Sequence, residues 1–159
     1  MTEGQEFAVH EEPVWRERAN FLIHAKLPES GRPECFEQLW TRQLGDEEFQ
    51  ICCIPFFVPG LVLGDVVATS PGHGLTYVVD RLVEPSGRYV FRAWPGQPFH
   101  PQDEIARGLT ALGSLIEWSS AGMLAVDAAD GEHAKLVAGF LAERERAGQL
   151  TFQPGPARP

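Results

Sequence analysis

The feature that most constrains the fold is an apolar run over residues 54–67 that two prolines and two glycines interrupt. Pro55 and Pro59 lack an amide donor and clash with a preceding helical turn, so the run is neither an uninterrupted helix nor a plain strand. Gly60 and Gly64 supply the positive backbone φ angles of two turns. We therefore expect a buried strand end, a sharp bend and a new strand. The expected core contacts are Phe56, Leu61, Leu63 and Val66.

Length and charge limit the classes of function. The 159 residues suffice for one ordinary domain or two small ones, and the apolar content supports a core. The net charge of -9, without clustered Lys and Arg, argues against nucleic acid and against an anionic membrane surface as partners. No run approaches the roughly 18 apolar residues of a membrane span, and the N-terminal residues are polar and acidic. We expect a cytoplasmic protein.

Cysteine and histidine usage agrees with that expectation. There are three cysteines, and Cys52 and Cys53 are adjacent, so buried free thiols are a better interpretation than a disulfide framework. The histidines are scattered, without HxH, HExxH or His-Cys clusters, and the cysteines form no CxxC pair. The sequence therefore predicts no metal and no cofactor.

The first half of the chain has the pattern of a small β unit. Residues 1–19 lack an apolar period and predict a flexible leader, from which Trp15 packs either back onto its own domain or onto a partner. Residues 20–86 carry short β-branched and aromatic runs separated by Gly/Pro turns. Such a pattern is typical of a small antiparallel barrel or strongly bent sheet. The expected strands cover residues 21–27, 36–44, 49–54, 66–69 and 75–83.

The periodicity changes after residues 84–87, and residues 87–155 predict a second unit. Apolar residues recur at helical spacing after Gln102 and again after Asp130, a good N-cap, and Gly113 and Gly148 end these helices. Strands are expected at residues 88–94, 115–118, 123–126 and 150–152. This β-α-β-β-α-β order fits a ferredoxin-like arrangement, a four-stranded antiparallel sheet with both helices on one face. The predicted fold class is α+β.

Several short motifs in this order resemble one known family. They are Leu39-Trp40, Leu44-Gly45-Asp46, Ile54-Pro55-Phe56-Phe57, Gly64-Asp65-Val66-Val67 and Val83-Glu84-Pro85-Ser86-Gly87. Over residues 20–155 the chain resembles the bacterial domain of unknown function DUF4265. The resemblance implies a small bacterial protein without an assigned chemistry. Two departures from the family pattern, Cys52-Cys53 and Arg88, put in doubt any catalytic role at those positions.

Asp65 is the first candidate for chemistry because it is a carboxylate within an apolar run. Buried without partners, it would have a raised pKa and could serve as a general base. Paired with an arginine or with backbone amides, it would be structural, and a turn-capping aspartate is the commoner case. Both interpretations remain open from the sequence.

Glu84, Ser86 and Arg88 form a second candidate site at the junction between the two expected units. Clefts between units favour ligand binding, and this one would offer a carboxylate, a hydroxyl and a guanidinium. The same residues also suit an ordinary turn. A nucleophilic pair of Cys53 with His24 is a weaker hypothesis, since it needs an exposed thiol with a low pKa.

These observations favour a small soluble noncatalytic module that binds a protein partner or a small ligand. The acidic charge suits a basic partner, for example in an immunity-type neutralisation, with an association rate that falls as salt rises. The alternative is a small hydrolase or accessory biosynthetic enzyme whose carboxylates and an imidazole converge in the cleft between the units. Whether the chain is an enzyme, and whether it is a monomer or a homodimer, stays open.

Overall fold

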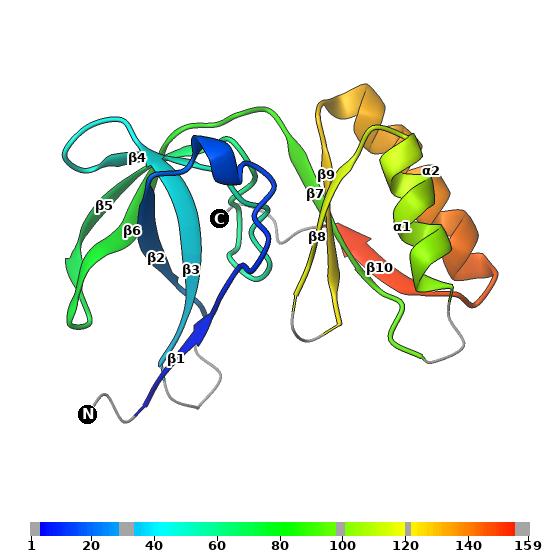
Figure 1. The fold of residues 1–159 in the computed structure, drawn as a ribbon, viewed down its shortest axis with the longest axis horizontal. Helices are drawn as coiled ribbons and strands as arrows, with labels where there is room; N and C mark the ends of the chain where they lie inside the picture. Colours follow the sequence, from blue (N-terminus) through cyan, green and yellow to red (C-terminus); the bar gives the residue numbers. More distant parts are fainter. Residues whose placement is uncertain (1–3, 29–33, 98–100, 120–121, 155–159) are drawn as a thin grey trace.

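The computed structural model describes residues 4–28, 34–97, 101–119 and 122–154. The fold is α+β, as predicted: a closed β-barrel stands beside a second sheet, and two helices cover the far face of that sheet (Figure 1). The last barrel strand ends at Glu84 and the first strand of the second sheet begins at Tyr89. Whether the two sheets form separate domains, divided near residue 86, stays a prediction.

The barrel consists of five strands in the order β3-β2-β6-β5-β4, and it closes because β4 also pairs with β3. Alternate side chains point inward along each strand, and Ile23, Leu39 and Phe49 are completely buried. The barrel strands are β2 (Phe21–Lys26), β3 (Glu34–Gln43), β4 (Glu48–Ile51), β5 (Val66–Gly72) and β6 (Leu75–Glu84).

The N-terminal residues depart from the predicted flexible leader. Strand β1 (Gln5–Ala8) pairs in parallel with the first part of β3, and a short 3-10 helix, η1, covers Arg16–Arg18. His10 is only 3% exposed. Trp15 does pack back onto the chain, since its backbone amide donates to the carbonyl of Cys52. The segment has no apolar periodicity of its own because tertiary contacts, rather than an amphipathic pattern, hold it in place. Residues 1–3 of the predicted leader lie outside the described residues.

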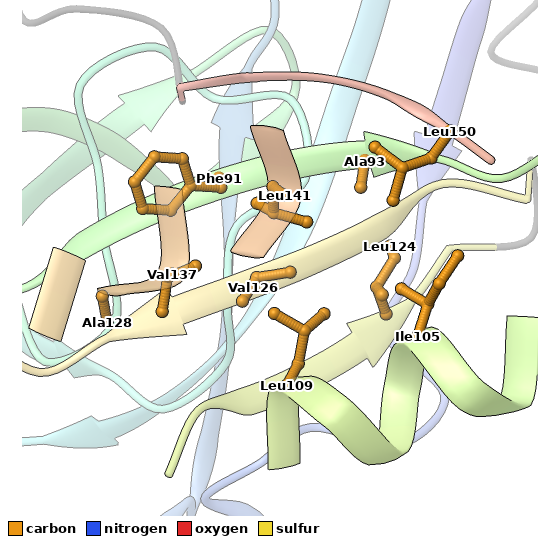
Figure 2. Packing of buried hydrophobic residues seen from close by; sticks show 10 residues of the cluster. All are labelled: Phe91, Ala93, Ile105, Leu109, Leu124, Val126, Ala128, Val137, Leu141 and Leu150. Carbon is orange, nitrogen blue, oxygen red and sulfur yellow. The ribbon is translucent and has the colours of Figure 1, made fainter. Parts of the chain in front are cut away.

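The second sheet has the antiparallel order β10-β7-β9-β8, with strands β7 (Tyr89–Trp94), β8 (Leu115–Trp118), β9 (Leu124–Ala128) and β10 (Thr151–Pro154). Helices α1 (Gln102–Ala111) and α2 (Gly131–Arg146) lie on one face of it (Figure 1). The predicted N-cap is confirmed, because the Asp130 carboxylate accepts from the backbone amide of His133. Figure 2 shows the apolar cluster between sheet and helices, including Phe91, Ala93, Val126 and Leu141.

The proline-rich run fills the space between the barrel and the second sheet. Ile54 and Phe56 pack against Ala125 of β9 and against Met123, which directly precedes that strand. All five residues of β9 are consequently buried, since the helices cover one face of the strand and the run covers the other. The two predicted turns are also observed, with φ of 74° at Gly60 and 86° at Gly64.

Candidate functional site

The structure brings Glu84, Ser86 and Arg88 together around an open pocket of about 350 Å³ at the junction of the two sheets. Trp15 reaches this pocket from the N-terminal segment, a contribution that the sequence did not reveal. The lining residues are Trp15, Gln50, Gly64, Val66, Glu84, Pro85, Ser86, Arg88 and Ala129.

Arg88 is held as a fixed ion pair at this pocket. Its Nε donates to Asp127 Oδ1 at 2.9 Å, and a terminal nitrogen donates to Oδ2, which makes the pair bidentate. The hydrogen bonds that Arg88 donates to Asp127 raise the pKa of Arg88, and burial opposes them only in part. The charge of Arg88 is therefore already compensated, and the guanidinium also lies 5.6 Å from the centre of the Trp15 ring.

Ser86 and Glu84 have different roles at the rim. The Ser86 hydroxyl donates to the carbonyl of Leu63 at 2.7 Å and accepts from the Arg88 amide, so it fixes the turn. Glu84 is exposed, and within the described ranges its carboxylate has no hydrogen bond or ion pair. Glu84 is the group of the predicted set that remains available to a ligand.

Asp65 lies beneath the pocket and does not line it. It is completely buried, with Oδ1 accepting from the amide of Ser86 at 2.8 Å and Oδ2 accepting from the amide of Val62 at 3.0 Å. These bonds make Asp65 a cap for two turns, which is the structural interpretation considered above. The arrangement offers no basis for proton transfer by Asp65 to a bound molecule.

A buried polar cluster around His10 was not identified from the sequence. His10 lies between two carboxylates, with Nε2 at 2.6 Å from Glu37 Oε2 and Nδ1 at 2.7 Å from Glu117 Oε1. Glu37 belongs to the barrel and Glu117 to the second sheet, and all three side chains are almost completely buried. The imidazole also stacks on Phe56, with ring centres 4.0 Å apart.

Both nitrogens of His10 must donate if both carboxylates are ionised, so the ring is an imidazolium. Burial lowers the pKa of His10, but the neighbouring Cys53 and the hydrogen bonds to Glu117 and Glu37 outweigh it and raise this pKa to about 12. The two carboxylates also accept hydrogen bonds from backbone amides. Glu37 accepts from the amides of Phe56 and Phe57, and Glu117 accepts from the amide of Ile54. The polar groups of this cluster are therefore hydrogen-bonded to one another and to the backbone of the protein.

Cys53 lies beside His10 rather than beside His24, its partner in the sequence-based hypothesis. Burial raises the pKa of the Cys53 thiol, and the thiol is inaccessible to solvent. Burial also raises the pKa of Cys52, to about 11. A nucleophilic thiolate needs a lowered pKa and access to substrate, so this geometry does not favour cysteine chemistry.

One sequence signal could have pointed to the buried cluster. Glu37 alternates with Leu39 and Thr41 along β3, and Glu117 alternates with Leu115 along β8, so both carboxylates stand on strand faces that carry buried or partly buried side chains. A carboxylate at such a position needs a buried partner. No group of three or more His, Cys, Asp or Glu side chains suited to a metal ion occurs in the part of the chain that the structure describes.

A family comparison settles which proteins this chain is related to. The model for a domain of unknown function, DUF4265, matches residues 37–152. The chain belongs to the DUF4265 family. The matched region includes the proline-rich run, the junction pocket except for Trp15, and both carboxylates of the buried cluster, whereas His10 precedes it.

A solved structure shares the fold of this DUF4265 protein. It is described as "Novel crystal structure of a hypothetical protein from Neisseria gonorrhoeae", and it matches with a TM-score of 0.70 and 20% identity. The match covers 85% of this chain and 93% of that chain, and at this identity it shows the fold alone.

No curated protein matches the chain. Among the described residues, no helix is long and apolar enough to cross a membrane.

Proposed function

We propose that this DUF4265 protein is a noncatalytic binding module that receives a basic group of a protein partner in the junction pocket. The observation that carries the proposal is the contrast between two sets of polar groups. His10, Glu37, Glu117 and Asp65 are buried and hydrogen-bonded within the protein, so they are not available to a substrate. Glu84, by contrast, is exposed at the rim of a pocket.

The pocket has the chemistry to receive a cation. Glu84 supplies a carboxylate, and Gln50 and Trp15 supply an amide and an aromatic ring. The guanidinium of Arg18 already lies over the Trp15 ring at 4.3 Å, so the ring accepts a cation in this orientation. An arginine or lysine of a partner would replace Arg18 there and pair with Glu84.

The net charge of -9 supports a basic partner, because a field of that sign accelerates encounter with a positive surface. Neutralisation of such a partner, in the manner of an immunity protein, is the form of the proposal that we favour. We also interpret the second sheet as ferredoxin-like, which its β-α-β-β-α-β element order supports.

Native mass spectrometry of the protein in lysate from its own host would test the proposal. We expect one specific protein partner whose complex weakens as ionic strength rises. Glu84→Gln should reduce the bound fraction about tenfold or more, since it removes the carboxylate that the pocket offers to a cation.

Glu143→Gln is the matched control, because Glu143 is exposed on α2 and its substitution changes the net charge equally. An equal loss of bound partner in the two variants would show that the net charge of the protein, and not the pocket, determines binding. A retained small-molecule mass without a protein partner would contradict the proposal and direct attention to the enzymatic alternative.

A further inference from the structure

Arg92 is a buried cation that the junction pocket and the His10 cluster do not use. It lies on β7 between Phe91 and Ala93, which Figure 2 shows on the helix side of the sheet, so Arg92 points to the opposite face, toward the barrel. The residue is 8% exposed. Its Nε is inaccessible to solvent and, among the described residues, has no hydrogen-bond partner.

The neighbouring charges are already paired. Glu37 lies close enough to influence Arg92, but its oxygens accept from His10 and from the amides of Phe56 and Phe57. Asp127 accepts both bonds of Arg88. In the described part of the chain, the guanidinium of Arg92 thus has a nearby countercharge but no hydrogen bond to it.

A buried donor without a partner is costly, because the Nε–H of Arg92 has lost water without gaining an acceptor. Burial lowers the pKa of Arg92, and Glu37 opposes this effect only partly. Buried polar groups of native proteins are almost always hydrogen-bonded, so an exception such as this Nε calls for an explanation, of which a bound anion is one.

The sheet register shows what surrounds this guanidinium. Glu117, Ala125, Arg92 and Gln153 form one row across β8, β9, β7 and β10. Ala125 separates the two charged residues with a small side chain, whereas Gln153 is directly beside Arg92 on the edge strand and is exposed. The exposed part of Arg92 therefore lies toward β10, where the side-chain amide of Gln153 is within reach of its guanidinium.

We propose that Arg92 anchors a binding site for a carboxylate, with the Gln153 amide as a second donor. The planar guanidinium fork matches the two oxygens of a carboxylate. The site holds one cation without a hydrogen-bonded anion, so a monoanion balances it better than a phosphate dianion. The narrow exposure of Arg92 restricts the ligand to one that presents its carboxylate at an end, such as a small organic acid.

Titration of the full chain with sodium acetate, at ionic strength held constant with sodium chloride, would test this site. The arginine Nε–H resonances and the Tm are followed together. We expect a saturable shift of the assigned Arg92 resonance, with a Kd on the order of 1 mM or weaker because acetate has few atoms to bind. A tenfold excess over Kd should raise the Tm by about 3–6 °C.

The control variants separate this site from surface binding. Arg92→Gln should abolish the response to acetate. If this variant does not fold, Arg92→Met is used in its place and should abolish the response as well. Arg107→Gln, at an exposed position on α1, should retain the response. The absence of a saturable shift in the wild type up to about 100 mM acetate would overturn the proposal. An equal response in an Arg92 variant, or a stronger response to sodium phosphate than to acetate, would also overturn it.

Discussion

His10 determines how two carboxylates can be buried side by side between the sheets. Glu37 and Glu117 each approach one nitrogen of its ring, so the imidazolium stands between two negative charges. Replacement of one partner in a buried ionic cluster typically costs about 3–5 kcal/mol, because the remaining charges lose their compensation. The family match begins at residue 37, and the role of His10 was therefore invisible from the family motifs.

The raised pKa of His10 predicts how stability changes with pH. The folded protein keeps this proton up to about pH 12, whereas an unfolded histidine loses it near 6.5. The stabilisation is therefore fully present below pH 6.5 and is lost as pH rises from there toward 12. Between about pH 7 and 8.5, we expect the free energy of unfolding to fall about 2 kcal/mol more in the wild type than in His10→Asn.

Urea unfolding at several pH values measures this difference. Cysteine titration in the unfolded chain sets in over this range, but it is common to the two proteins and cancels in their difference. If His10→Asn does not fold, uptake of about one proton on refolding of the wild type near pH 7.5, where the unfolded thiols are still mostly protonated, provides the same test. Parallel stability curves, or refolding without proton uptake, would show that His10 is neutral in the folded protein.

Most strands and helices could be predicted because each carries a local pattern. The departures have identifiable physical causes. Strand β4 ends at Ile51 rather than at residue 54, because the amide of Ile54 donates to Glu117 instead of to a neighbouring strand. Strand β5 continues to Gly72, since His73 and Gly74 both have positive φ and form a two-residue turn.

The candidate site could be predicted only where it follows the chain locally. Glu84, Ser86 and Arg88 are close in sequence and share the pocket, whereas Trp15 reaches it from another segment. His10 and Glu117 are 107 positions apart, and such a contact leaves no trace in periodicity. Long-range pairings of buried polar groups are therefore the part of this structure that the sequence could not supply.

The turn at Gly64 supports the junction pocket and gives a test of its packing. Gly64 has a φ of 86°, and a Cβ there would lie 3.0 Å from Ser86 Cβ and 3.5 Å from the Trp15 ring. We expect Gly64→Ala to destabilise the protein by about 2 kcal/mol or more, from backbone strain and this contact together. Trp15 fluorescence should also change.

Gly74→Ala isolates the backbone contribution. Gly74 has a φ of 78°, and a Cβ added there would have no atom of the described residues within 4 Å beyond its chain neighbours. Its expected cost is about 1 kcal/mol, measured by the same urea unfolding. Equal costs for the two variants would indicate that Trp15 and Ser86 do not pack tightly over Gly64.

The barrel and the second sheet are joined by both apolar and ionic contacts. Phe56 packs against the second sheet and stacks on His10, and His10 bonds to one carboxylate from each sheet. The N-terminal segment thus supplies the cation that links the two halves. This arrangement predicts that the two sheets unfold as one cooperative unit.

Native-state hydrogen exchange would measure that cooperativity. In the wild type, the slowest amides of β5 and β9 should exchange with the same opening free energy, because opening either sheet exposes the His10 cluster. In His10→Asn the two values should separate by about 1 kcal/mol or more, since repulsion between Glu37 and Glu117 favours parting of the sheets. His73→Asn is the control: His73 pairs with Glu34 at the half-exposed end of the barrel, where an ion pair contributes little. Unequal opening free energies in the wild type would mean that the sheets are independent units that only share a covering segment.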